Sequence, residues 1–120
     1  MEKSKALQNR LTELVIDTIN LTGKLPKNYA NEIFIRQLIR CLSSIGANYT
    51  EAIFSYSRPD FTHNTNICKK EAAEAIYWFV LLIRTNPKYT SSLENLKSET
   101  ESILKIFISV VKTTQRNNKL

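Results

Sequence analysis

Apolar residues recur along most of this chain at spacings of three and four, with polar residues between them. This period places the apolar side chains on one face of an α-helix. Leu7, Leu11 and Leu14 begin the first of four such series, and the other three are of similar or greater length. The four series predict α-helices over residues 5–22, 30–56, 60–85 and 91–114, followed by a polar tail at residues 115–120.

Glycine, proline and capping residues mark the expected ends of these helices. Gly23 and Pro26 follow the first series and predict its C-terminal end. Asp60, directly after a proline, is expected to cap the third helix. Gly46 lies inside the second series, where a glycine costs about 1 kcal/mol relative to alanine. A glycine at such a position indicates close approach by another helix.

The predicted connections between the helices are short, which favours antiparallel packing of neighbouring helices. The chain has 120 residues, the size of one domain, and shows no internal repeat. It contains only 2 Gly and 3 Pro, too few for the frequent turns of a β-sandwich or barrel. We therefore predict an all-α protein in which residues 1–120 form a single antiparallel, up-down-up-down four-helix bundle.

The charge of the chain is positive and unevenly distributed. Lys and Arg total 17 and Asp and Glu total 11, for a formal net charge of +6, and no acidic residue follows Glu101. Cations at the C-terminal end either complement a helix dipole or form a footprint for nucleic-acid phosphates, and both interpretations stay open. The candidate nucleic-acid-binding residues are Lys105, Lys112, Arg116 and Lys119, with Arg58, Lys69 and Lys70 as further candidates.

A series of polar residues runs beside the apolar face of the second predicted helix, at spacings of four and three. An arginine–carboxylate ladder toward the third helix would pair these groups and fix which helices are neighbours. The functional alternative is a recessed polar site that grips a ligand. The predicted polar network comprises Arg36, Arg40, Ser44, Asn48 and Glu51 on the second helix, and Glu71 and Glu74 on the third.

The residues offer little support for catalysis. A di-iron bundle needs two Glu-x-x-His motifs, but His63 is the only histidine and follows no such pattern. Cys41 and Cys68 fit no metal-ligand spacing and are expected to be reduced, buried side chains. We predict that the protein is not an enzyme and has no catalytic residue, metal or cofactor.

The same sequence argues for a cytoplasmic protein without a membrane partner. Residues 1–10 lack the apolar core of a signal peptide. The longest apolar run, residues 75–83, is far shorter than the ~20 residues that span a bilayer. Reduced cysteines are also typical of the cytoplasm.

Several aromatic residues can either stack on nucleic-acid bases or pack within the core and against another subunit. The third helix has more apolar residues than one bundle core needs, and a second apolar face indicates a second partner. Tyr77 and Trp78 lie on that face and are the candidate oligomer-interface residues. The full set of candidate aromatic residues is Tyr49, Tyr56, Tyr77, Trp78 and Tyr89.

One segment is specific enough to suggest a family. Residues 40–52, Arg-Cys-Leu-Ser-Ser-Ile-Gly-Ala-Asn-Tyr-Thr-Glu-Ala, resemble a signature of a bacterial four-helix-bundle family. That family includes the proteins encoded by intervening sequences in bacterial large-subunit ribosomal RNA genes. Residues 60–78 and 103–114 resemble the third and fourth helices of the same family. Ile53-Phe54, with Tyr56 close behind, departs from the small or polar residues that usually follow the signature.

The resemblance implies a left-handed antiparallel bundle that assembles as a homopentamer and has no known catalysis. A distantly similar relative is the accessory protein of a diversity-generating retroelement, which partners a reverse transcriptase and its nucleic acid. We therefore expect a non-enzymatic oligomeric scaffold that binds RNA or DNA phosphates through a basic surface. The alternative is a protein-interaction module whose partner is a reverse transcriptase or a ribosome-associated protein.

Overall fold

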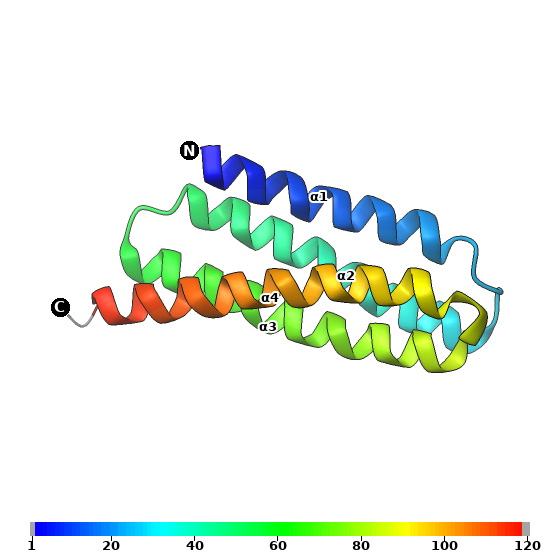
Figure 1. Ribbon diagram of the computed structural model, residues 1–120. Coiled ribbons are helices and arrows are strands. Elements are labelled where there is room, and N and C mark those ends of the chain that lie inside the picture. The colour runs from blue at the N-terminus through cyan, green and yellow to red at the C-terminus, as the bar shows by residue number, and fades with distance from the viewer. Residues whose placement is uncertain (1, 119–120) are drawn as a thin grey trace.

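The computed structural model describes residues 2–118, and these residues form an elongated bundle of 50 × 23 × 21 Å (Figure 1). Consecutive long helices run in opposite directions, as Figure 1 shows. The predicted all-α, four-helix fold is confirmed, while the left-handed sense of the bundle stays a prediction. None of the described helices is both long and apolar enough to cross a membrane. The elements are α1 (Glu2–Thr22), α2 (Tyr29–Ile53), α3 (Arg58–Thr85), the short 3₁₀ helix η1 (Pro87–Tyr89) and α4 (Thr90–Asn118).

Helix α3 lies at the centre of the packing and contacts α2 and α4 most extensively. Small buried side chains on α3, among them Cys68, Ala72 and Ala75, let these neighbours approach its backbone. Helix α1 packs less extensively, against α2 and α4. The core is built from Leu11 and Leu14 of α1, Leu38, Leu42 and Ile45 of α2, Phe79 and Leu82 of α3, and Leu93, Ile103 and Phe107 of α4.

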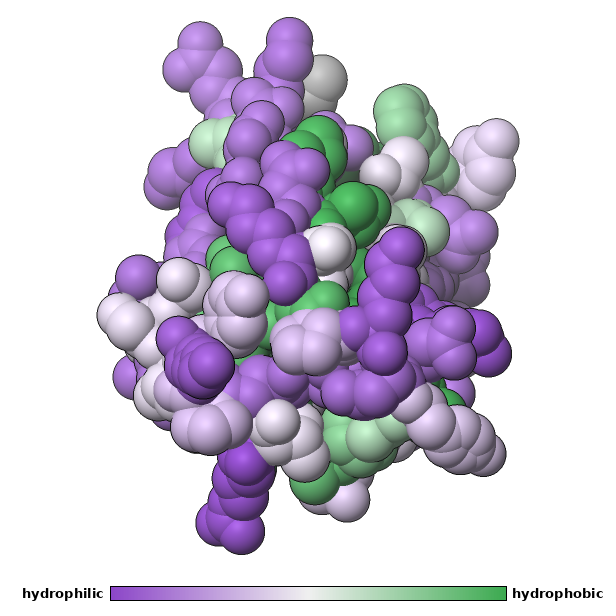
Figure 2. Space-filling model, turned by 90° about the vertical axis from the view of Figure 1, so that its right-hand side faces the viewer, coloured by the Kyte–Doolittle hydropathy of each residue, from purple (hydrophilic) through white to green (hydrophobic). Residues whose placement is uncertain are grey.

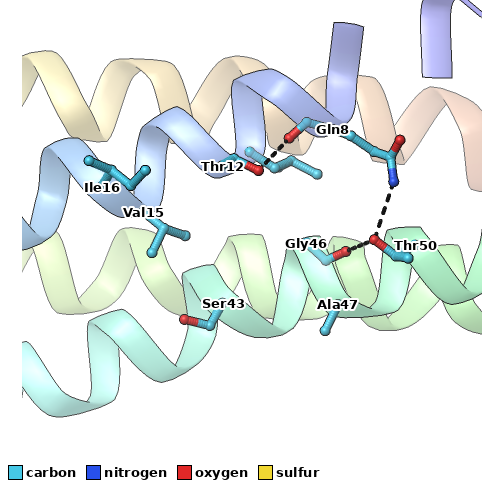
Figure 3. A pocket seen from close by; sticks show the side chains of 9 residues that line it. Gln8, Thr12, Val15, Ile16, Ser43, Gly46, Ala47 and Thr50 are labelled. Carbon is cyan, nitrogen blue, oxygen red and sulfur yellow. Dashed lines mark hydrogen bonds between the residues drawn. The ribbon is translucent and has the colours of Figure 1, made fainter. Parts of the chain in front are cut away.

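The α1–α2 contact passes over Gly46, as the glycine indicated (Figure 3). A Cβ atom at Gly46 would lie 4.0 Å from Cβ of Leu11, at ordinary van der Waals distance. The two helices leave a shallow groove of about 330 Å³ between them on the outside of the bundle. The Gln8 side-chain amide donates a hydrogen bond to Oγ1 of Thr50 across this groove, at 3.3 Å.

Four boundaries differ by two residues or more from those expected, the first being the start of α1, at Glu2 rather than residue 5. Helix α2 ends at Ile53 and not at residue 56, so residues 54–57 form a loop. The cap of α3 is Ser57 rather than Asp60, and Oγ of Ser57 accepts from the backbone N–H of Asp60 at 3.2 Å. The helix starts two residues earlier than expected because Pro59 fits its first turn. Helix α4 continues to Asn118, so residues 115–118 are helical rather than a tail.

A buried pair of asparagines joins three segments at one end of the bundle. The side-chain amide of Asn31 donates to Oδ1 of Asn86 at 2.9 Å, and that of Asn86 donates to Oδ1 of Asn31 at 2.8 Å. Asn31 also donates to the carbonyl of Pro26, and Asn86 to the carbonyl of Leu82. These bonds hold the α1–α2 loop and the start of α2 against the end of α3.

Candidate nucleic-acid interface

The middle of the bundle carries cations that are already paired with carboxylates. Arg10 of α1 makes a two-pronged contact with Glu99 of α4, at 2.8 and 3.0 Å, which raises the pKa of the arginine. Lys97 lies 3.6 Å from Glu94 and 3.7 Å from Glu101, all on α4. Lys70 of α3 and Lys105 of α4, by contrast, are exposed and form no ion pair within residues 2–118.

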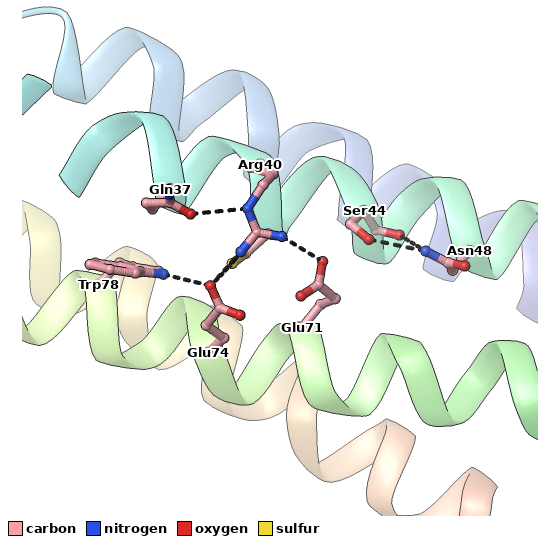
Figure 4. Close-up of polar contacts among 8 residues, drawn as sticks. Gln37, Arg40, Ser44, Asn48, Glu71, Glu74 and Trp78 are labelled. Atoms are coloured by element: carbon pink, nitrogen blue, oxygen red, sulfur yellow. Dashed lines mark hydrogen bonds and ion pairs between the residues drawn. The ribbon is translucent and has the colours of Figure 1, made fainter. Parts of the chain in front are cut away.

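A second ion-pair cluster joins α2 to α3 (Figure 4). The guanidinium of Arg40 donates to Oε2 of Glu71 at 3.2 Å and also to Oε2 of Glu74. The same Glu74 oxygen accepts from the indole N–H of Trp78 at 2.9 Å and from the thiol of Cys41 at 3.1 Å. The bond from Trp78, followed by those from Cys41 and Arg40, lowers the pKa of Glu74.

The predicted polar network is thus only partly assembled. Ser44 and Asn48 bond to each other along α2, where the Asn48 amide donates to Oγ of Ser44 at 3.0 Å. Arg36 and Glu51 are exposed, and neither has a hydrogen bond or ion pair to the cluster within residues 2–118. The reason is the lack of partners on the antiparallel helix α3. Arg36 lies toward the C-terminal part of α3, which has no acidic residue beyond Glu74. Glu51 lies toward its N-terminal part, which has no Lys or Arg between Arg58 and residue 69.

The cluster also offers metal-ligand atoms. One atom each from Cys41, Glu71 and Glu74 lie within 4.8 Å of one another. The guanidinium of Arg40 contacts both carboxylates and already supplies the positive charge that they need. Burial, then the hydrogen bond to Glu74, raises the pKa of the Cys41 thiol to about 12, which favours the protonated form over a metal-binding thiolate. The geometry is that of an interhelical ion pair.

Unpaired cations gather where three segments meet. The N-terminus of α1, the α2–α3 loop and the C-terminus of α4 lie at the same end of the bundle (Figure 1). We call this the termini end and define it as residues 2–8, 50–61 and 110–118. It carries three acidic residues, Glu2, Glu51 and Asp60. Its five cations form no ion pair within the described chain, and they are Lys3, Lys5, Arg58, Lys112 and Arg116.

The structure brings together only part of the predicted basic set. Arg58, Lys112 and Arg116 lie at the termini end and are exposed. Lys69 is 11 residues into α3, about 16 Å along the helix at 1.5 Å per residue, so it and Lys70 lie away from that end. Lys105 lies a similar distance back along α4. Lys119 is outside the described residues. Lys3 and Lys5 join the cluster although the sequence pattern did not single them out.

Two aromatic side chains project from the loop of the termini end. Phe54 is 75% exposed and Tyr56 is fully exposed. Both rings are exposed because α2 ends at Ile53. In a helix continued to residue 56, the two side chains would extend the apolar face of α2. Of the other aromatic candidates, Tyr49 is buried against Phe107, with ring centroids 5.6 Å apart. The hydroxyl of Tyr89 donates to the carbonyl of Lys24 at the opposite end.

The predicted interface residues lie on the outer side of α3. Tyr77 is 55% exposed, and its ring meets that of Trp78 edge-on with centroids 5.2 Å apart. Trp78 is half-buried because it also packs against Phe34, with centroids 6.1 Å apart. Tyr77 therefore offers more free surface than Trp78.

Two hollows flank Ile53 at the termini end. The larger, about 530 Å³, is bordered by Tyr56, Arg58 and Phe61 and reaches the end of α4 at Thr114 and Asn117. The smaller, about 380 Å³, lies between Phe54 and the start of α1 at Lys5. Both also include Ser4. The termini end therefore combines concave apolar surface, exposed rings and unpaired cations.

The opposite end of the bundle is also basic. Figure 2 looks onto this end, where hydrophilic residues cover most of the surface and apolar groups show between them. Within residues 2–117, it carries a single strongly exposed aromatic residue, Tyr29, at 74%. Among the described residues, its cations are Lys24, Lys27, Arg36, Arg84 and Lys88. Positive charge alone therefore does not distinguish the two ends, whereas the pair of exposed rings does.

Comparison with known proteins places the chain in a family. A crystal structure of a protein with unknown function from the S23 ribosomal protein family of Bacteroides thetaiotaomicron VPI-5482 is 34% identical in sequence. It superimposes with a TM-score of 0.78 over 92% of this chain and 98% of its own. No protein with a curated description matches significantly. The family profile described as 23S rRNA-intervening sequence protein matches residues 3–109. The chain therefore belongs to the 23S rRNA-intervening sequence protein family.

Proposed function

We propose that this chain is a non-enzymatic helical scaffold that binds the phosphate backbone of RNA or DNA at its termini end. The observation that carries the proposal is that this end combines five cations without an ion pair and two exposed aromatic rings. Arg10 and Arg40, in the middle of the bundle, contact carboxylates. The five cations of the termini end contact none within residues 2–118. Unpaired surface cations are the ones free to replace the counterions of a phosphate chain.

The number of these cations sets the expected salt dependence. If three or four of the five contact phosphates, the logarithm of affinity falls with the logarithm of salt at a slope of about −3. Between 50 and 200 mM salt, each subunit then loses roughly 50- to 150-fold in affinity for duplex DNA, and roughly 20- to 50-fold for a single strand. Little preference among sequences is expected, because phosphate contacts carry no base information.

A pair of matched variants tests the location. Lys112→Gln with Arg116→Gln removes two cations from the termini end, and Lys88→Gln with Arg84→Gln removes two from the opposite end. Fluorescence anisotropy with a labelled oligonucleotide should show the salt slope falling by about 2 in the first variant and unchanged in the second. Binding that is independent of salt, or equal effects of the two variants, would contradict the proposal.

We also propose that the scaffold is a homo-oligomer, with five subunits as the family resemblance implies. Exposed apolar side chains that support this are Ile16 and Ile19 on α1, Tyr77 on α3 and Ile108 on α4. Five copies would carry a formal charge five times +6, which strengthens attraction to polyanions at low salt. Light scattering should give five times the 13.8 kDa of one chain, and a monomer-sized mass would exclude the assembly.

The second candidate function is a protein-interaction module. The observation that favours it is the exposed ring of Tyr77, which adjoins Trp78 and lies away from the termini end. Its partner would be a reverse transcriptase or a ribosome-associated protein. A partner captured by the protein should then survive nuclease treatment and be lost with Tyr77→Ala but not with Arg116→Gln.

A further inference from the structure

We infer that the termini end recognises single-stranded nucleic acid by accepting two unstacked bases, one against Phe54 and one against Tyr56. This inference rests on the proposed function and adds the class of strand that is bound. The phosphates of the strand would contact the surrounding cations, and the bases would enter the two hollows that flank Ile53.

The exposure of the two rings is the first argument. Phe54 and Tyr56 leave most or all of their surface in water, although burying an aromatic side chain stabilises a protein by about 2 kcal/mol or more. Neither ring contacts another aromatic ring within residues 2–118. Both belong to the loop between α2 and α3, which is fixed at its two ends by α2 and by the Ser57 cap. The loop therefore presents two free aromatic faces from a defined backbone.

The surroundings of the rings suit a nucleotide better than a purely apolar ligand. The hollow beside Tyr56 has apolar walls from Ile53 and Phe61, a guanidinium from Arg58 and an exposed amide from Asn117. The hollow beside Phe54 has both the ammonium-bearing side chain of Lys5 and the carboxylate of Glu2 on its border. A base offers a flat apolar face and a polar edge, and it is always attached to an anionic phosphate. Each of these features has a complementary group in or beside the two hollows.

The spacing of the rings fits one strand. The Cα atoms of Phe54 and Tyr56 are two residues apart, so they are separated by at most ~7 Å. Neighbouring bases are ~3.4 Å apart in a stacked strand and can be spaced more widely once they are unstacked. Both rings can therefore engage neighbouring bases of the same strand. A duplex hides the faces of its bases in its own stack, so stacking on side chains selects unpaired strands.

The test separates bases from phosphates. The probes are a labelled 12-nucleotide DNA of mixed sequence, its duplex, and a 12-mer of abasic residues with the same number of phosphates. The wild-type full chain should bind the single strand at least tenfold more tightly than the abasic strand, since stacking on each ring contributes roughly tenfold. Phe54→Ala with Tyr56→Ala should abolish this difference and leave the salt slope unchanged.

A matched control variant and a measurement of folding accompany these binding tests. Tyr29 is as exposed as Phe54 but lies at the opposite end, so Tyr29→Ala should leave all three affinities unchanged. Circular dichroism should show wild-type thermal unfolding for all the variants, because the removed side chains are exposed. Equal binding of the single strand and the abasic strand, or tighter binding of the duplex, overturns this inference and leaves the proposed function intact. Absence of binding to all three probes overturns both.

Discussion

The asparagine pair at the start of α2 gives a sharp prediction about stability. Asn31→Ala removes three hydrogen bonds at once: two to Asn86, at 2.8 and 2.9 Å, and one to the carbonyl of Pro26, at 2.8 Å. Oδ1 of Asn86 is then left without the amide that donates to it, in a residue that is 5% exposed. An unsatisfied buried polar group costs about 1–3 kcal/mol. We expect a loss of about 2–3 kcal/mol in the free energy of unfolding.

Urea unfolding followed by circular dichroism measures this loss, and thermal unfolding should shift by about 10 °C for a domain of this size. Asn86→Ala should cost a similar amount. The double variant should cost about 1–2 kcal/mol less than the sum of the two, because each single change orphans the other amide. Asn95→Ala, an exposed asparagine on α4, is the control and should stay within ~0.5 kcal/mol of wild type. A small effect of Asn31→Ala, or additive single effects, would refute this reasoning.

Three further predictions concern helix packing and ionisation. Gly46→Ala should stabilise the fold by about 0.5–1 kcal/mol in urea unfolding, because alanine favours the helix and its Cβ would meet Leu11 at an ordinary 4.0 Å. A less stable variant would show that the α1–α2 groove needs the glycine. Burial raises the pKa of both Cys41 and Cys68 to about 12, above the ordinary 9.0 of an unfolded thiol. Their contribution to stability is therefore complete below pH 9 and is lost as the pH rises toward 12. Thiol reagents at pH 8 should react with the unfolded protein and not with the folded one. The pKa of Glu74 is lowered, first by the hydrogen bond from Trp78. The contribution of the Glu74 carboxylate to stability is therefore present above the ordinary pKa of 4.5 and is lost as the pH falls below it. Glu74→Gln should weaken the acid dependence of unfolding, and unchanged acid dependence would exclude this contribution.

Local patterns predicted the helical fold well. The period of apolar residues gives all four long helices, and Gly46 marks the place where α1 crosses close to α2. The pairing of Arg40 with Glu71 and Glu74 also agrees with the expected ladder between α2 and α3. Such features depend on residues within one turn of a helix or on opposite positions of neighbouring helices. Both kinds of feature can be predicted from the spacing of residues in the sequence.

Features that depend on the ends of elements were harder to predict. The apolar series of α2 continues through Phe54 and Tyr56, so periodicity alone extended the helix by a turn. Helix α2 ends instead where the backbone N–H groups of Phe54 and Ser55 turn back to the carbonyls of Glu51 and Ala52. The Asn31–Asn86 pair joins residues 55 positions apart, and no local pattern distinguishes a buried asparagine from an exposed one.

The candidate interface shows the same limit. Lys3 and Lys112 are more than 100 positions apart in sequence, and the antiparallel course of the chain brings their helix ends together. The C-terminal series of cations was visible because no acid interrupts it, whereas Lys3 and Lys5 follow Glu2 and form no such series. Conversely, Lys69 and Lys70 were candidates because they are basic, but they lie 11 and 12 residues into α3, away from the termini end.

Cross-linking tests the central claim most directly, because it reports the place of contact as well as binding. A labelled single-stranded oligonucleotide is bound to the full chain at low salt and irradiated, and the modified peptides are identified by mass spectrometry. The account predicts adducts on Phe54 or Tyr56 and on peptides that contain Lys112 or Arg116. Adducts confined to Tyr29 and its neighbours at the opposite end, or to Tyr77 on the outer side of α3, would contradict it.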